Sequence, residues 1–414
     1  MSTIIATGFL VYSIYLILKD YKRGMLFYIF SIYVAPVFNF GFIRIEFFLV
    51  SILPVVFVCL VKNNGKLHNI EINNWLNSYI LVSIAATAIS VFIYNVLNFQ
   101  GISLLGMILR TLFVSIIASA KLQFKDVIKV FEWLIVLNFI AVVIQMLINQ
   151  STKLFFDLYY TESMIPLMEV RNLGYFNRAY GLFPTPIFLG TFSLMCLTFL
   201  LFYGKRNYIT LIEELLCLIM GLASLTKTFI LGTVILGILF IVKWMISAHK
   251  TLYVRTVISI GLMAICTTVI IFELYIHNYP IFWYLKFLTK PLDSLTSRYS
   301  SSVGVLSKTT EIILENPIIG VGYNNIIGEY TGDSFLYCVL HDAGAIGIML
   351  FIAFFIKVSY KKHNKDIFFI LVVFSVLNVS SIIFFEPIGL IILYAITIFN
   401  NYSCAQVKRG ISSS

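Results

Sequence analysis

The chain has 414 residues, of which 60% are hydrophobic and only 12% are charged, and its mean hydropathy is +0.96. Soluble domains contain roughly a quarter charged residues, so this composition excludes a soluble protein and predicts an all-α, polytopic membrane protein. The net charge of +10 does not indicate nucleic-acid binding. Most Lys and Arg residues lie in short connections between apolar segments, where they orient a protein in its membrane.

The apolar segments predict a single polytopic domain over residues 1–414, with about 11–13 transmembrane helices. The predicted spans are 3–18, 24–38, 45–61, 76–94, 102–120, 131–148, 184–203, 208–226, 228–242, 255–276, 333–356, 367–385 and 387–401. Several are shorter than the roughly 20 residues that a perpendicular helix needs. The close pairs within 208–242 and 367–401 are each compatible with one helix or with two.

Basic residues concentrate in alternate connections, for example around Lys22, Lys66 and Lys125. The positive-inside rule assigns this set of connections to the cytoplasm, so the N-terminus is expected outside and the C-terminus inside; one span fewer or more before the first basic connection would place the N-terminus inside. Two long loops, 149–183 and 277–332, then face outward, and we expect each to contain short helices. The first apolar run has no basic n-region and no small-residue cleavage site, which predicts a first span rather than a signal peptide.

Cysteine and histidine show no ligand pattern. The six Cys are scattered singly, there is no CxxC, and the five His have no ligand spacing. The sequence therefore predicts no metal site, no disulfide framework and no cofactor.

The longest stretch that cannot lie in lipid runs from Arg298 to Gly347. Its serines at 300–302 are suited to capping a helix, and Asn316-Pro317 is expected to end that helix. Gly320 and Gly322 then permit a tight turn. An ordered, polar loop against apolar helices predicts a binding or reaction chamber at a membrane face.

The span after this loop begins at Asp333, either as a helix cap or as a general base at the surface. Helical spacing predicts one stripe on this span, made of Asp333, Tyr337, His341, Gly344 and Ile348. His341, with its neighbour Asp342, is expected about 12 Å below Asp333. Ionisable groups at that depth are candidates for a site, and a buried structural pair is an equal alternative. Gly344 and Gly347 are also compatible with close helix packing.

Arginines form a second group of candidates. Arg171, Arg178 and Arg298 lie in the outward loops, where a guanidinium is suited to binding phosphate or pyrophosphate; pairing with loop carboxylates or lipid headgroups is the alternative for each. Arg110 lies within a span, where an unpaired charge is costly, so we expect a partner or a wet cavity. The possible partners are Glu386, Glu273 and His341. Glu132, Glu213 and Glu214 are expected to be solvated near the cytoplasmic ends of their spans.

Three segments resemble the O-antigen polymerase (Wzy-type) and O-antigen ligase superfamily of bacterial inner-membrane glycosyltransferases. RAYGLFPTPIFLG (178–190) is similar to the family's first outer-loop motif, and SRYSSSVGVLSKTTEIILENPIIGVGYNN (297–325) resembles the second. DSFLYCVLHDAGAIGIMLF (333–351) resembles the acidic or His position that precedes a GxxG helix. The motifs are short, and their order and topology over most of the chain carry the resemblance. Ligases typically have a His-x-Asn/Ser/Gln arrangement where this chain has Gly332-Asp333-Ser334, which favours a polymerase.

The resemblance implies a metal- and nucleotide-independent polymerase of surface polysaccharide in the bacterial inner membrane. It implies that undecaprenyl-pyrophosphate-linked oligosaccharide repeat units are joined at the periplasmic face. Arg178 and Arg298 would neutralise the leaving pyrophosphate, and Asp333 would orient or deprotonate the acceptor hydroxyl. The substrate-binding residues expected beside them are Arg171, Tyr323, Asn324, Tyr337 and His341. Expected partners are lipid-linked oligosaccharides, membrane lipids, a chain-length regulator and a flippase, with no nucleic acid.

Three alternatives remain at this point. A ligase would transfer the finished glycan to lipid A core or to a protein. A lipid-linked oligosaccharide flippase or other transporter would have repeated or discontinuous halves with sites near the midplane; the long loops and the absence of a repeat oppose this class, while Arg110, His341 and Asp342 favour it. A purely structural membrane protein leaves the charged loops unexplained.

Overall fold

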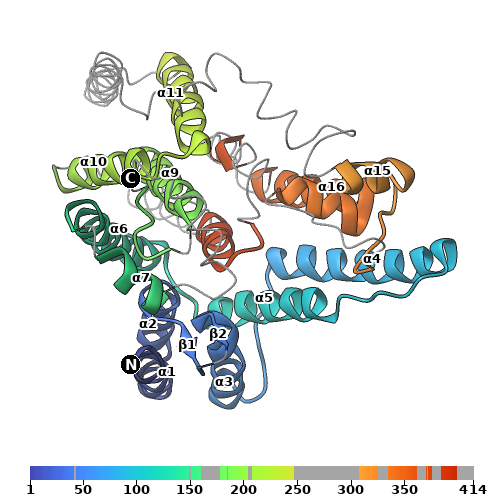
Figure 1. Cartoon of the computed structure of the whole chain (residues 1–414), viewed down its shortest axis with the longest axis horizontal. Coiled ribbons are helices and arrows are strands. Elements are labelled where there is room, and N and C mark those ends of the chain that lie inside the picture. Colours follow the sequence, from blue (N-terminus) through green and yellow to red (C-terminus); the bar gives the residue numbers. More distant parts are fainter. Residues whose placement is uncertain are drawn as a thin grey trace, which may run out of the picture.

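The computed structural model of the chain describes residues 1–41, 43–148, 151–159, 178–183, 185–203, 208–246, 307–324, 334–360, 370, 372–374 and 384–398. The described part is mostly helical (Figure 1). Its elements are α1 Ser2–Lys19, α2 Tyr21–Val34, β1 Phe38–Asn39, β2 Arg44–Ile45, α3 Phe47–Lys62, α4 Glu71–Tyr94, α5 Gly101–Ser119, α6 Phe124–Leu147, α7 Ser151–Tyr159, α9 Pro186–Tyr203, α10 Tyr208–Ala223, α11 Lys227–Ile246, α15 Ser307–Glu315 and α16 Phe335–Tyr360. A further helix, Pro387–Ile398, follows near the end of the described chain.

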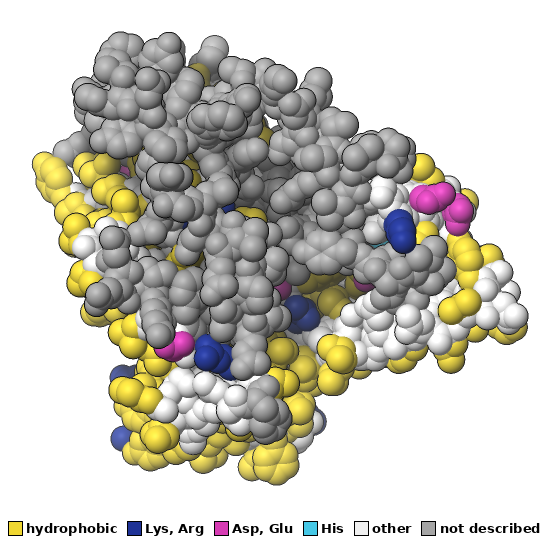
Figure 2. Space-filling model, viewed as in Figure 1, with side chains coloured by type: hydrophobic (Ala, Val, Ile, Leu, Met, Phe, Trp, Pro, Cys, Tyr) yellow, Lys and Arg dark blue, Asp and Glu magenta, His cyan; other side chains and the backbone are white. Residues whose placement is uncertain are grey.

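Five of the described helices are long and apolar enough to cross a membrane, judged by length and composition alone: α1, α4, α5, α6 and α16. The last of these is interrupted at Gly344. Shorter apolar helices accompany them. Large apolar side chains are exposed on these helices, including Phe92 and Ile102, each 89% exposed, and Figure 2 shows hydrophobic side chains covering much of the described surface. Such surfaces are expected where lipid rather than water surrounds the protein. The structure is consistent with the predicted all-α membrane protein, while the predicted span 255–276 lies outside the described residues.

The first helices are joined by tight connections. Asp20 separates α1 from α2 and caps α2, because its side chain accepts a hydrogen bond from the Arg23 amide at 3.2 Å. After α2 the chain forms a small antiparallel hairpin, in which β1 pairs with β2 and Phe38 lies opposite Ile45. No strand was predicted in this connection, because strands of two residues give too short a pattern to detect.

The ambiguous segment 208–242 forms two helices. α10 ends at Ala223 and α11 begins at Lys227. Leu225 in the intervening turn has a positive φ of 49°, a conformation that cannot continue a right-handed helix. The adjacent helices α9 and α10 pack extensively against each other.

Connections that the charge pattern assigns to the same side of the membrane contact each other. At the expected cytoplasmic ends, Lys22 pairs with Asp126 at 2.5 Å, and the Lys62 ammonium donates to the Leu18 carbonyl at 2.7 Å. At the opposite ends, Arg44 of the hairpin pairs with Asp157 of α7 at 3.8 Å. The hairpin is therefore attached to the first long loop.

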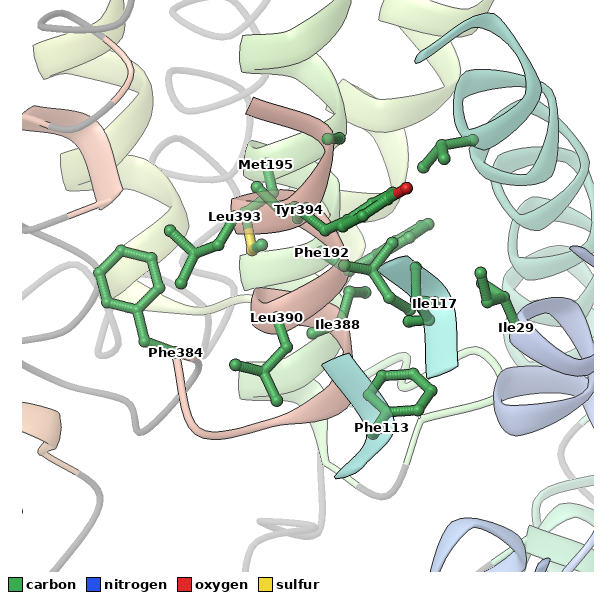
Figure 3. Close-up of a cluster of buried hydrophobic side chains, with 14 of the residues drawn as sticks. Ile29, Phe113, Ile117, Phe192, Met195, Phe384, Ile388, Leu390, Leu393 and Tyr394 are labelled. Carbon is green, nitrogen blue, oxygen red and sulfur yellow. The ribbon is translucent and has the colours of Figure 1, made fainter. Parts of the chain in front are cut away.

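Helix Pro387–Ile398 packs in the middle of a hydrophobic core. Figure 3 shows Ile388, Leu390, Leu393 and Tyr394 of this helix among buried side chains from α2, α5 and α9. The neighbouring side chains labelled there are Ile29, Phe113, Ile117, Phe192 and Met195. This packing holds residues 384–387, at the start of the helix, against α5. Glu386 of the candidate site lies in this segment.

α16 is folded back on itself at Gly344, whose φ and ψ of 57° and −153° are not helical. The rings of Phe335 and Phe351 lie 4.7 Å apart, whereas a straight helix would separate these positions by about 24 Å. Residues 339 and 347 are also in contact, because a Cβ added at Gly347 would lie 2.8 Å from a Val339 side-chain carbon. The two arms, 335–343 and 345–360, form an antiparallel helical hairpin.

The hairpin corrects two predictions made from the sequence. Residues 333–356 were predicted as one span, and positions 337, 341, 344 and 348 were predicted to share one helical stripe. Both predictions assumed an uninterrupted helix, and Gly344 interrupts it. Tyr337 and His341 lie on the first arm, and Ile348 lies on the second. The apolar composition of both arms concealed the reversal, because a hairpin buried in protein and a single span have the same hydrophobicity.

Candidate functional site

Loop 316–324 follows the short helix α15 and contains the predicted tight turn. α15 ends at Glu315, directly before Asn316-Pro317, as expected. Gly320 has a φ of 75°, and a Cβ at this position would lie 2.4 Å from the His341 carbonyl oxygen. Glycine is required here both for its backbone conformation and for the close approach of the loop to α16.

The loop caps both helix ends at the tip of the hairpin. The Val321 amide donates to the His341 carbonyl at 2.7 Å, at the end of the first arm. At the start of the second arm, the Ala345 and Ile346 amides donate to the carbonyls of Pro317 and Ile318 at 2.8 and 3.2 Å. Helix ends within a membrane protein need such partners, because they leave backbone groups without intrahelical hydrogen bonds.

Helix α4 holds the other side of loop 316–324. The Tyr323 amide donates to the Thr87 hydroxyl at 2.8 Å, and the Ser90 hydroxyl donates to the Val321 carbonyl at 3.0 Å. Asn324 is completely buried; its oxygen accepts from the Asn98 amide at 2.8 Å, and its amide group donates to the Val96 carbonyl at 2.9 Å. These bonds give Asn324 a structural role, and its predicted role in substrate binding stays a prediction.

Three polar side chains meet at the hairpin tip. The Tyr79 hydroxyl of α4 donates to one Asp342 oxygen at 2.7 Å, and the other Asp342 oxygen lies 2.8 Å from Nδ1 of His341. His341 is only 5% exposed. The sequence predicted His341 and Asp342 as a buried structural pair or as site residues. In the structure they form a hydrogen-bonded pair joined to α4, with His341 buried and Asp342 partly buried.

Tyr323 lies between this tip and α5. Its side chain is 3% exposed, and its hydroxyl lies near the Ser83 hydroxyl, although neither hydroxyl has a hydrogen-bond partner of normal geometry among the described residues. Burial, with repulsion from Asp342, raises the pKa of Tyr323 well above its ordinary value, and attraction to Arg110 opposes the rise. Tyr323 therefore remains a neutral phenol. Tyr337, also predicted to bind substrate, lies 3.2 Å from the Thr310 hydroxyl through its own hydroxyl.

Arg110 lies in the middle of α5 and pairs with Glu386. Its Nη2 atom is 3.7 Å from a Glu386 carboxylate oxygen, and its Nε donates to the Phe385 carbonyl. Both side chains are 20% exposed, and within the described chain Nη1 of Arg110 makes no hydrogen bond. Glu386 was one of the three predicted partners. His341 pairs with Asp342 instead, and Glu273 lies outside the described residues.

Glu386 is held by the helix that follows it. The Leu390 amide donates to the Glu386 carbonyl at 3.1 Å, so Glu386 occupies the position before the first helical residue, Pro387. Proline is favoured at that first position, and the positive end of the helix dipole favours a carboxylate beside it. Local sequence thus fixes the carboxylate that faces Arg110.

Glu46 is a further acidic residue of this site that the sequence analysis missed. It precedes α3 directly and makes no capping hydrogen bond. It is exposed, yet desolvation by the surrounding protein raises its pKa to about 7, with repulsion from Glu386 adding to the rise and attraction to Arg110 opposing it. Its carboxyl is therefore accessible at the surface, while the protein around it replaces part of the solvent that would stabilise its charge. Figure 2 shows basic and acidic side chains close to each other in a hollow of the face drawn there.

We call the region around Arg110 that includes Glu46 and Glu386 the recess. The available signal for Glu46 was a single carboxylate in the apolar segment IRIEFFLV. That signal was ambiguous, because a glutamate at the start of a span is ordinary as a helix-capping or interfacial residue.

Arg178 lies at the turn between α10 and α11, and two backbone carbonyls accept from its guanidinium. Nε donates to Ser224 at 3.1 Å, and Nη2 donates to Leu225 at 3.4 Å. The other predicted outer-loop residues, Arg171, Arg298 and Asp333, lie outside the described residues. The expected gathering of Arg178, Arg298 and Asp333 therefore stays a prediction.

Two glutamates predicted as solvated are buried. Glu213 and Glu214 of α10 are 7% and 4% exposed, and one Glu213 oxygen has no hydrogen-bond partner in the part of the chain that the structure describes. The prediction was wrong because α6 and α9 pack over α10, which the sequence of α10 alone does not reveal. Among the described residues, no group of three or more His, Cys, Asp and Glu side chains could hold a metal ion.

Comparison with known proteins adds no relative. No family model matches the chain. No curated protein and no solved structure matches it either.

Proposed function

We propose that the protein is a membrane glycosyltransferase that polymerises a surface polysaccharide. In this proposal it joins oligosaccharide repeat units linked to undecaprenyl pyrophosphate, at the periplasmic face of the bacterial inner membrane. Support comes from the order of the motifs at 178–190, 297–325 and 333–351 and from the polar groups of the recess. The reaction uses a leaving group that already carries its phosphates, so it requires neither a nucleotide nor a metal.

One observation carries the proposal: Arg110 in the middle of an apolar helix, partly exposed to a recess and only partly neutralised by Glu386. Its Nε and Nη2 atoms are engaged by Phe385 and Glu386, which leaves Nη1 for a ligand. An arginine in a low-dielectric site stabilises an anion far more strongly than one in water. A pyrophosphate that gains charge as its bond to sugar breaks is such an anion.

The surrounding structure supplies the rigidity that catalysis requires. Loop 316–324 is bonded to the hairpin tip and to α4, and Tyr323 from this loop interacts electrostatically with Arg110. Residues held by such bonds lose little freedom when a substrate binds, which favours the orientation of two tethered sugars. Arg178, Arg298 and Asp333 remain the residues proposed from the resemblance alone.

The hairpin at Gly344 favours a second candidate function. Broken or reversed helices with polar tips inside the membrane are typical of transporters, and His341 and Asp342 occupy such a tip. A flippase for lipid-linked oligosaccharides would bind the same pyrophosphate but would transfer no sugar. A ligase would use the same donor with lipid A core or a protein as acceptor.

Deletion of the gene in its host tests these functions against one another, with the surface glycan separated on a gel and lipid-linked sugars analysed by mass spectrometry. A polymerase deletion leaves core capped by single repeat units. A ligase deletion leaves bare core and accumulates lipid-linked polymer, and a flippase deletion accumulates single units on the inner leaflet. A normal polysaccharide ladder in the deletion strain contradicts the proposed polymerase. Arg110→Ala, expressed in the deletion strain at the wild-type level, is expected to restore no ladder.

A further inference from the structure

The recess contains two acidic side chains, and only one of them forms an ion pair with Arg110. Glu386 pairs with Arg110 at 3.7 Å, and each occupies a fixed place, on the helix start at 387 and on α5. Glu46 approaches the same arginine from α3, without a hydrogen bond or an ion pair within the described chain. An exposed carboxyl held beside a guanidinium but not bonded to it is available to a ligand.

Packing of the residues after Glu46 fixes its position. Phe47 contacts Tyr28 of α2 with ring centroids 6.4 Å apart, and Phe48 contacts Phe113 of α5 at 5.2 Å, edge to face. Phe113 lies one helical turn from Arg110. The start of α3 is thereby held next to the turn of α5 that carries Arg110, so Glu46 and Arg110 belong to one rigid wall of the recess.

The charged groups that act on Glu46 are Arg110 on α5 and Glu386 before the last described helix. Arg44 on β2 lies two residues before Glu46 in the chain, and Tyr33 on α2 interacts electrostatically with Glu386. Arg44 is directed to Asp157 of α7, and the Tyr28 hydroxyl is bonded to Ser51. Glu386 is paired with Arg110. Glu46 is thus the acidic group of the recess that is exposed and not engaged by its neighbours.

We propose that Glu46 is the proton acceptor of the glycosyl transfer, facing the acceptor sugar while Arg110 faces the pyrophosphate. This inference rests on the proposed function. The acceptor hydroxyl oxygen forms a bond to the anomeric carbon of the donor sugar, and the bond from that carbon to the pyrophosphate oxygen breaks. Its electron pair leaves with the lipid pyrophosphate, and the hydroxyl proton passes to the Glu46 carboxylate, which later releases it to water.

The environment of Glu46 suits this task. A general base works best when its pKa lies near the working pH, and enzymes raise glutamate pKa values to that range by burial. Desolvation raises the pKa of Glu46 to about 7. The group is therefore a stronger base than an ordinary glutamate and is still ionised in a large share of molecules at neutral pH.

The test uses the full-length protein in detergent, with lipid-linked repeat units extracted from host cells that lack the gene. For Glu46→Gln we expect a fall in kcat of about 100-fold or more with little change in KM. The wild-type kcat should rise with pH through about 7, and the variant should lose this rise. Glu311→Gln, an exposed glutamate on α15, is the matched control and should keep the wild-type rate and pH profile.

A second variant separates a chemical role from misfolding. Glu46→Ala removes the carboxylate and leaves space for formate, which should restore part of the lost rate in a concentration-dependent way. No restoration by formate, or a Glu46→Gln rate and pH profile equal to wild type, overturns the inference while leaving the proposed function intact. If the wild-type protein extends no chain from the lipid-linked units, the proposed function fails and the inference fails with it.

Asp333→Asn, assayed in parallel, should keep the rise in kcat near pH 7 even if its rate is reduced. Loss of that rise in Asp333→Asn alone assigns the base to Asp333 and overturns the inference.

Discussion

The rings of Phe335 and Phe351 lie 4.7 Å apart, although the two residues are 16 positions apart in the sequence. The contact requires α16 to reverse at Gly344, and the reversal brings His341 and Asp342 to a hairpin tip. Loop 316–324 then caps the tip and carries Tyr323 towards Arg110. The reversal at Gly344 therefore determines which polar groups can meet.

Replacing Gly344 by alanine should unfold the tip. A side chain is strained at a φ of 57°, and the added Cβ would lie 2.4 Å from the Ile318 carbonyl carbon. We expect a loss of stability of at least about 1–3 kcal/mol, measured as a lower midpoint of thermal unfolding in detergent. Gly237→Ala on α11 is the control, since its Cβ would meet nothing within 4 Å. Equal midpoints for the two variants would contradict the hairpin.

Breaking the Arg110–Glu386 pair should cost more than removing both charges. Glu386→Met leaves a guanidinium without its carboxylate, and Arg110→Met leaves a carboxylate without its guanidinium; loss of one partner of a buried pair typically costs about 3–5 kcal/mol. The exposure of 20% for each side chain reduces this figure. The double variant should unfold at a higher temperature than either single variant. Additive losses in this double-mutant cycle would show that the two groups do not interact.

Tyr79→Phe should destabilise the hairpin tip. The substitution removes the hydroxyl that donates to Asp342 at 2.7 Å. Leaving a buried acceptor without its hydrogen bond costs about 1–3 kcal/mol, and the 19% exposure of the Asp342 side chain places the expected loss at the lower end of this range. Tyr15→Phe, on a tyrosine of α1 that is 53% exposed, supplies the matched comparison. Thermal unfolding of both variants measures the difference, and a Tyr79 variant as stable as the Tyr15 variant would be inconsistent with the described contact.

Stability should depend on pH through Glu46. Its folded-state pKa is raised from 4.5 to about 7, so the folded protein binds the proton more tightly than the unfolded chain. The stabilisation is fully present below about pH 4.5 and is lost as the pH rises through about 7. Glu46→Gln should remove this component, which is measured as the difference between wild-type and variant unfolding midpoints from pH 5 to pH 8. A difference that does not change with pH contradicts the raised pKa.

The class of fold and several local features follow from the sequence alone. Apolar composition predicted the membrane helices, Asn316-Pro317 predicted the end of α15, and Gly320 predicted the turn after it. These features depend on residues close together in the chain, where sterics and hydrophobicity act directly. The need for a partner at Arg110 was also predictable, because a charge in the middle of an apolar helix is costly.

Tertiary structure alone decided which partners met. Composition could not distinguish Glu386 from Glu273 or His341 as the partner of Arg110, and it gave no sign that Glu46 would face the same recess. Composition also could not distinguish a single span from a hairpin at Gly344, because the apolar side chains are removed from water in both arrangements. Local sequence determined where helices begin and end, whereas the packing of α3, α5 and the helix Pro387–Ile398 determined which charges those ends bring together.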